Sequence, residues 1–418
     1  WDQETYMPPG AIEARAEQLT TLARLSHEKF TDEEIGRLLE AAATELDGTS
    51  FDVGNPAFDS DDASLVRVAT RDWKRATKIP ADLVARLAHA SSMGQQAWQQ
   101  AREVSDFSVF KSHLEAIVEL TGEKAEALGY KDRIYDPLLA EFEPGISTAE
   151  IESLFTTLRE RLIPIVQELT EETSSGGITD YESPPTAQSQ IALPPLDRSF
   201  DEAAQWDFGV AVIKDFGFDF NHGRQDRSAH PFTTAFSVAD VRLTTRIHED
   251  FLPAGLFGTL HECGHGLYEQ GFAPELARTP LADGASLGLH ESQSRLWEIL
   301  IGRSRPFWTH YFPKLSESFP KTLDGIDPDA FYRAINVVRP TLIRVESDEV
   351  TYNLHIMLRF ELENALLEGR VAAHRVESRL DAGLGNQQFL IARERGDVVL
   401  LGEPHRGRRV FDVRRTRE

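Results

Sequence analysis

The chain has 418 residues, 41% of them hydrophobic, which is enough for a large buried core and too many for a disordered protein. Its net charge of −24 argues against nucleic acids and anionic membranes as partners, and no apolar run approaches the roughly 18 residues of a membrane span. A single cysteine, Cys263, excludes an internal disulfide. The opening residues are charged and include no signal peptide or initiating Met, so we expect a cytoplasmic protein with a trimmed N-terminus.

Helical periodicity dominates the first part of the chain, where apolar residues recur every three to four positions. Ser147 and Glu150 have the spacing of a capping box, which predicts a helix start just before Ile151. The segments with the clearest helical pattern are 12–25, 87–104, 107–128 and 151–169.

The middle of the chain has two segments of another kind. Ser, Gly, Thr and Pro clusters predict a loop over 171–198, and alternation of apolar with polar residues predicts an extended segment over 238–247. A second extended segment begins at His230-Pro231-Phe232-Thr233. The pattern therefore predicts a mainly α-helical protein with one small β-sheet.

The sequence His261-Glu262-Cys263-Gly264-His265 is an H-E-x-x-H motif. On a helix, residues i and i+4 lie on one face, so both imidazoles can reach one Zn2+ ion. Glu262 follows the first histidine and is placed to take a proton from a water molecule without binding the metal. Chance occurrence is the alternative, and the apolar helical flanks argue against it. The motif predicts a catalytic zinc site.

A catalytic zinc ion usually has a third protein ligand. Glu291 is the best candidate, because Pro and Gly residues between the two segments allow the chain to turn back toward the histidines. A solvated helical glutamate is the alternative interpretation, and the neighbouring His290 competes for the ligand role. Cys263 is a weaker rival, since it faces away from the histidines and is typical of a small packed thiol.

Two further clusters are candidates for substrate binding or for orienting the ligand histidines. Asp240 can orient a ligand imidazole and Arg242 can bind a carboxylate, although a surface ion pair between them is the plainer interpretation. His230 begins the extended segment nearby. Arg344 opens a charged stretch that ends before Tyr352, and this stretch is either a substrate-binding wall or a solvated helix face.

These motifs resemble those of the M32 metallocarboxypeptidases, the thermostable carboxypeptidase type. The similarity runs from Trp1 to about Arg370 and includes 217–220, 230–233, 240–244, 261–271, 290–293 and 348–352. It implies one helical domain over 1–370 with a zincin-type site, a deep groove and a small sheet beside it. It also implies a homodimer, Zn2+ with Co2+ as a possible replacement, and Glu291 as third ligand. An arginine at the position of Arg344 is associated with the closed end of the groove.

The C-terminal segment 371–418 departs from this family pattern. The family's Gln-Asp-x-His-Trp motif and Tyr-rich segment are absent, and 10 Arg against 7 acidic residues give the segment a charge of +3. The remaining 370 residues therefore carry −27, and only nine lysines occur in the whole chain. Acidic, lysine-poor surfaces are typical of salt-adapted proteins, so we favour a halophilic protein over a merely acidic one.

The resemblance implies release of single amino acids from peptide C-termini by metal-activated attack of water. Two alternatives remain open. An oligopeptidase of another H-E-x-x-H family has the same motif in an open-ended groove. A catalytically impaired or inactive fragment is the other, because the C-terminal motifs are missing.

Overall fold

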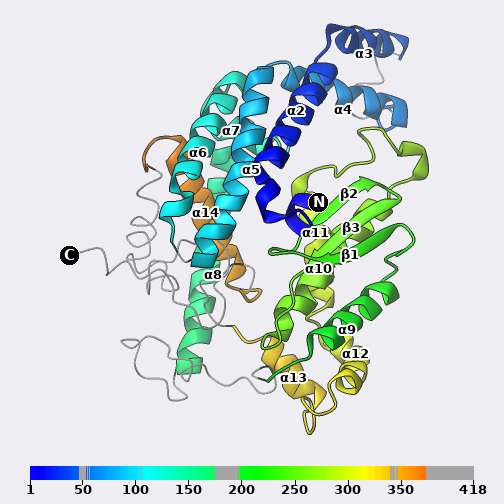
Figure 1. The fold of residues 1–418 in the computed structure, drawn as a ribbon, viewed down its shortest axis with the longest axis vertical. Coiled ribbons are helices and arrows are strands. Elements are labelled where there is room, and N and C mark those ends of the chain that lie inside the picture. The colour runs from blue at the N-terminus through cyan, green and yellow to red at the C-terminus, as the bar shows by residue number, and fades with distance from the viewer. Residues whose placement is uncertain are drawn as a thin grey trace, which may run out of the picture.

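The computed structural model describes residues 1–46, 53, 55, 57–104, 106–174, 196, 198–338, 344 and 347–372. This part of the chain is mainly helical, as the sequence predicts (Figure 1). None of its helices has the length and hydropathy needed to cross a membrane. In order, the N-terminal elements are α1 (Asp2–Thr5), η1 (Pro9–Ala11), α2 (Ile12–Phe30), α3 (Glu33–Glu45), α4 (Asp61–Ala76), α5 (Ala81–Val104), α6 (Ser108–Leu128), α7 (Asp136–Leu139) and α8 (Thr148–Ser174).

The second half contains the sheet and the helices that pack around it. Its elements are α9 (Glu202–Asp215), β1 (Gly223–Arg227), β2 (Thr233–Ser237), β3 (Asp240–Thr245), α10 (Leu252–Gln270), η3 (Pro274–Leu276), α11 (Leu287–Arg295), η4 (Leu296–Ile301), α12 (Arg305–Ser318), α13 (Pro328–Ile335) and α14 (Tyr352–Leu367).

The predicted helices are present, with two corrections of detail. The capping box forms as expected: the Ser147 N–H donates to Glu150 Oε2 at 2.8 Å, and the Glu150 N–H donates to Ser147 Oγ at 3.3 Å. The predicted loop over 171–198 begins too early, because α8 continues to Ser174. The second half of the apolar stripe of α2 is not a core face among the described residues, since Leu22 and Leu25 are 62% and 52% exposed, whereas Ile12 at its start is buried.

The small sheet has three strands in the order β1-β3-β2. β1 pairs with β3 in parallel and β2 pairs with β3 antiparallel, with an irregularity between Ala235 and Ser237. Only the β3 segment is predicted in full from alternation. β1 cannot be predicted from alternation, because its sequence, Gly-Arg-Gln-Asp-Arg, has no apolar side chain.

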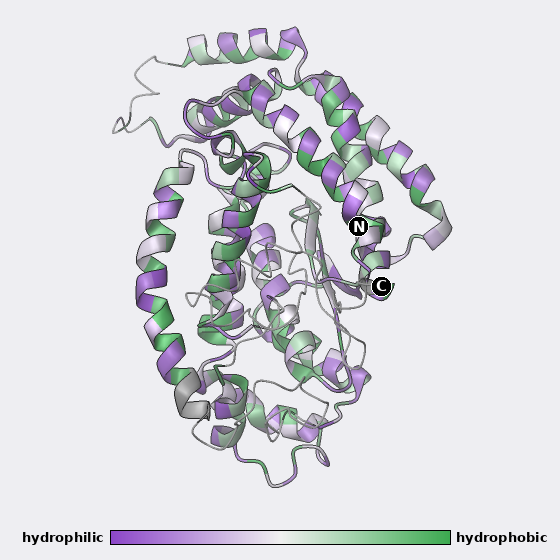
Figure 2. Cartoon of the chain, turned by 90° about the vertical axis from the view of Figure 1, so that its left-hand side faces the viewer, coloured by the Kyte–Doolittle hydropathy of each residue, from purple (hydrophilic) through white to green (hydrophobic). Residues whose placement is uncertain are grey.

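The largest hydrophobic core lies between the sheet and helices α9, α10, α12 and α13. Glycine allows the close packing of α10 on the sheet: a Cβ atom at Gly266 would lie 2.8 Å from Phe218 Cε2 and 2.9 Å from Leu243 Cδ2. Smaller clusters join α14 to α6 and to α8. Hydrophobic and hydrophilic residues alternate along many of these helices, as expected for elements with one buried face (Figure 2).

Candidate metal centre and active site

Helix α10 presents His261 and His265 one turn apart on the same face. Its other face is fixed in the core, where Leu260 and Cys263 are fully buried. Burial raises the pKa of the Cys263 thiol, so this residue is a packed neutral side chain. The helix therefore holds the two imidazoles on a rigid base.

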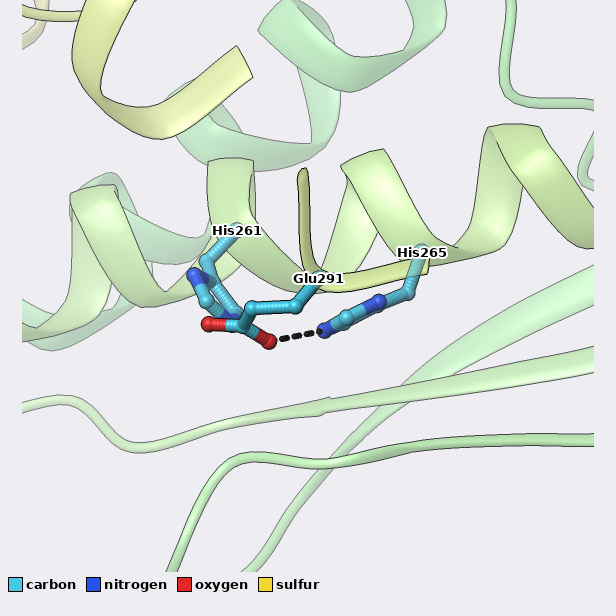
Figure 3. Close-up of side chains that lie close together, drawn as sticks. All are labelled: His261, His265 and Glu291. Atoms are coloured by element: carbon cyan, nitrogen blue, oxygen red, sulfur yellow. Dashed lines mark ion pairs between the residues drawn. The ribbon is translucent and has the colours of Figure 1, made fainter. Parts of the chain in front are cut away.

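Gly264, between the histidines, lets helix α11 come close to α10. A Cβ atom here would lie 2.5 Å from the Ser294 Cα atom and 2.7 Å from the Gln293 carbonyl oxygen. This contact between backbones brings Glu291, one turn earlier on α11, to the two histidines (Figure 3). The glycine in the motif thus has a packing role that spacing alone does not reveal.

The three side chains form a compact set of possible metal ligands. Glu291 Oε2 lies 3.4 Å from His265 Nε2 and 3.8 Å from His261 Nε2, and one donor atom from each residue lies within 4.8 Å of the others. Donors at 2.0–2.2 Å from a tetrahedral ion are roughly 3.3–3.6 Å apart. The geometry and the two-nitrogen, one-oxygen chemistry therefore fit a Zn2+ ion with one open position.

The Nδ1 atom of each histidine already has a partner. His261 Nδ1 donates to Glu298 Oε2 at 2.9 Å, and His265 Nδ1 lies 2.7 Å from His290 Nδ1. Burial lowers the pKa of His261, but the bond to Glu298 and the charge of Glu262 outweigh it and bring that pKa to about 8. Both Nε2 atoms are consequently left to face Glu291 and a metal ion.

Glu262 is 5% exposed, and the Thr233 hydroxyl donates to its Oε2 atom at 2.7 Å. Burial raises the pKa of this carboxyl above its ordinary value, against the lowering effect of His261 and His265. A carboxylate with a raised pKa is better matched to proton transfer near neutral pH. The site therefore contains a candidate general base beside the candidate ligands.

A cavity of about 110 Å3 opens beside Glu262 and His261. Its lining includes Pro253, Phe257 and Gly258 of α10 together with four arginines. These are Arg246, Arg295, Arg303 and Arg344. The cavity is therefore suited to a ligand that combines an apolar part with a negative charge.

Tyr352 links two of these arginines. Arg344 Nη1 donates to the Tyr352 hydroxyl, and the Arg295 guanidinium lies 4.0 Å from the centre of the tyrosine ring. The site also uses a wide helical turn, because η4 is a π-helix in which the Gly302 N–H donates to the Trp297 carbonyl at 2.9 Å. This turn directs both Glu298 and Arg303 to the cavity.

The structure separates the other predicted site residues into two groups. His230, Arg344 and Tyr352 line the cavity. Arg242 and Asp240 instead form a two-bond ion pair at 2.8 and 2.9 Å, which corresponds to the plainer interpretation of these residues. The hydrogen bonds to the imidazoles of His261 and His265 that the structure describes involve Glu298 and His290 rather than Asp240.

Sequence reasoning misses several residues of this region, among them Arg246, Glu269, Arg295, Glu298 and Arg303. Only the helical spacing of Arg295 and Glu298 from Glu291 is visible in the sequence, and it does not reveal the bond between Glu298 and His261. The others depend on contacts between elements that are distant in sequence. The tail from 373 to 418 and its predicted departure lie outside the described residues.

Comparisons with known proteins agree over nearly the whole chain. A family model described as Carboxypeptidase Taq (M32) metallopeptidase matches residues 1–391. Thermostable carboxypeptidase 1 of Thermus thermophilus is 42% identical over 382 residues, which are 89% of this chain and 70% of the relative. Carboxypeptidase 1 of Bacillus subtilis is 35% identical over 389 residues, 93% of this chain and 72% of the relative.

Solved structures show the same similarity. The crystal structure of an M32 carboxypeptidase from Deinococcus radiodurans R1 has a TM-score of 0.79 at 37% identity, covering 97% of this chain and 76% of that chain. A structure titled BsuCP has a TM-score of 0.80 at 34% identity, covering 90% and 71%. The matched family range includes the first part of the 371–418 tail, of which the structure describes only residues 371 and 372.

Proposed function

The chain belongs to the M32 family of metallocarboxypeptidases, which are peptide hydrolases, and we propose that it releases single amino acids from peptide C-termini with Zn2+. We assign His261, His265 and Glu291 as the ligands and Glu262 as the catalytic base. The observation that carries this proposal is the convergence of the three donor atoms beside a buried carboxylate. Co2+ is expected to substitute, because it accepts the same nitrogen and oxygen donors.

A metal ion held by these residues would lower the pKa of a bound water molecule toward about 7 and would polarise the scissile carbonyl group. Glu262 accepts the proton of the attacking water and then passes it to the leaving amine. The Thr233 hydroxyl holds the Glu262 carboxylate toward the reacting atoms through its 2.7 Å bond. Burial keeps this carboxyl poised for the exchange, since it raises its pKa.

An enzyme that acts at a C-terminus must recognise a free carboxylate. We assign this role to Arg344, because it lines the cavity next to His261 and Glu262 and is oriented by Tyr352. Arg242, the other predicted candidate, donates two hydrogen bonds to Asp240 instead. A guanidinium suits the task because it binds a carboxylate through two parallel hydrogen bonds.

Three wider expectations accompany this function. We propose a homodimer and a cytoplasmic location, on the strength of the family membership, together with adaptation to high salt. The last rests on the net charge of −24 and the scarcity of lysine.

Peptides that differ only in their C-terminal group test the proposal. The zinc-loaded protein is incubated with one peptide bearing a free carboxylate and with the same peptide amidated, and the products are followed by mass spectrometry. Stepwise loss of single residues from the free peptide alone is expected. Internal cleavage of both peptides would indicate an oligopeptidase, and no cleavage of either by fully loaded protein would indicate an inactive chain.

A further inference from the structure

His290 occupies a bridging position between two residues of α10. It lies on α11 directly before Glu291, and its ring reaches back to His265 and Glu269, which are four residues apart on one face of α10. Its Nδ1 atom is 2.7 Å from His265 Nδ1, and its Nε2 atom is 2.7 Å from Glu269 Oε1. The side chains of His290 and Glu269 are 16% and 14% exposed, so water has little access to either bond.

The number of available protons determines which atom donates and which accepts in each of these two hydrogen bonds. His265 offers its Nε2 lone pair to the metal, so in the neutral imidazole the proton is on Nδ1. Only one proton fits between two nitrogens 2.7 Å apart, and His290 Nδ1 must therefore accept it. His290 then carries its own proton on Nε2 and donates it to the Glu269 carboxylate.

We propose that His290 is a positioning residue that transmits the charge of Glu269 to the zinc ligand His265. This rests on the proposed function, in which His265 binds the metal. The arrangement fixes the tautomer and the orientation of His265 and makes its Nε2 atom a stronger donor. It also removes His290 from the competition for the metal, because both of its nitrogens are already bonded.

The packing around His290 supports a fixed orientation. The Tyr268 ring meets it edge to face, with centroids 5.1 Å apart and planes at 88°. On another side, a Cβ atom at Gly284 would lie 3.3 Å from His290 Cδ2, so the backbone closes over the ring. The two ligand histidines thus have different supports: His261 bonds a carboxylate directly, and His265 reaches one through a second imidazole.

Four variants of the full chain and one control variant test this assignment. His290→Leu removes the acceptor at similar size. His290→Asn restores it, because the asparagine oxygen takes the place of Nδ1, whereas His290→Gln places its polar atoms near Nε2 and leaves the His265 N–H without a partner. Glu269→Gln keeps a neutral acceptor but removes the charge. Tyr268→Phe is the matched control, because it keeps the ring that packs on His290.

The readout is the rate of zinc release into an excess of a colorimetric chelator, with the melting temperature of each metal-free variant as a check on folding. His290→Leu and His290→Gln should release zinc about 10–100 times faster than the parent, with His290→Asn and Tyr268→Phe within a few fold of it. Combining Glu269→Gln with His290→Leu should add nothing to His290→Leu alone, because Glu269 acts only through His290.

The results distinguish a failure of the proposed function from a failure of the proposed role of His290. A parent protein that does not bind one zinc ion would refute the proposed function itself. A parent that binds zinc normally while folded His290→Leu releases it at the parent rate would refute only the role of His290. Equal loss in His290→Asn and His290→Leu, with an independent effect of Glu269→Gln, would overturn the inference and make His290 a ligand.

Discussion

The glycine inside the metal-binding motif gives a sharp test of how the site is assembled. Substitution of Gly264 by alanine adds one carbon where α10 and α11 touch. The new Cβ atom would lie 2.5 Å from Ser294 Cα, 2.7 Å from Gln293 O and 2.9 Å from Ser294 N. All three are backbone atoms, so no change of side-chain rotamer relieves the contact.

The size of the effect follows from these distances. Ordinary van der Waals contact begins at 3.4 Å, so α11 must move by about 1 Å. Zinc sites tolerate about 0.2 Å in a ligand distance, and Glu291 moves with α11. Overpacking costs about 1–3 kcal/mol, and the higher helix propensity of alanine returns about 1 kcal/mol. We expect a folded protein, destabilised by up to about 2 kcal/mol, with markedly weakened zinc binding.

Zinc content after dialysis and chemical denaturation measure the two effects separately. Gly122→Ala is the matched control, because Gly122 lies within α6 and an added Cβ would meet no atom within 4 Å. That variant should keep its zinc and gain up to about 1 kcal/mol. Parent-like zinc binding and stability in Gly264→Ala would show that the close approach of the two helices does not position Glu291.

Four further predictions follow from the site and the composition. Glu262→Gln should keep zinc and lose turnover by about 10²–10⁴-fold, and near-normal turnover would refute its role as base. Glu291→Ala should lose most of its zinc in elemental analysis, whereas an unchanged stoichiometry would transfer the ligand role elsewhere. Cys263 should resist alkylation at pH 8 in the native protein and react after denaturation, because it is fully buried and its pKa is raised; prompt labelling of the native protein would contradict this. The melting temperature should rise between 0.1 M and 1 M salt, as the Debye length falls from about 10 Å to about 3 Å, and a flat or falling value would refute salt adaptation.

Short-range sequence patterns are enough to predict much of the fold and of the candidate site. The positions of His261 and His265 follow from helical spacing alone, and the Ser147–Glu150 capping box forms because its bonds stay within four residues. The family resemblance adds Glu291, which spacing leaves open. The described helices and the three-stranded sheet agree with the predicted fold class.

The features that could not be predicted depend on contacts between segments that are distant in the sequence. Glu298 and His290, the partners of the imidazoles of His261 and His265, can be identified only once α11 and η4 pack against α10. The apolar pattern of α2 does not predict burial of Leu22, which is exposed. Periodicity identifies an apolar helix face but does not show which element, if any, covers it. Asp240 and Arg242 lie two residues apart on β3 and form an ion pair with each other rather than with the distant histidines.

The wide turn of η4 sets a limit on how this enzyme can change its length. In an α-helix each residue advances the chain by about 100° around the axis. Converting the π-turn between 296 and 301 to regular α-helix with no residue removed would therefore rotate everything after it by roughly that angle relative to Glu298, and Arg303 would leave the cavity wall. Loss of one residue would offset this rotation, so a change of length inside the turn is expected to be tolerated only where it preserves the relative direction of Glu298 and Arg303.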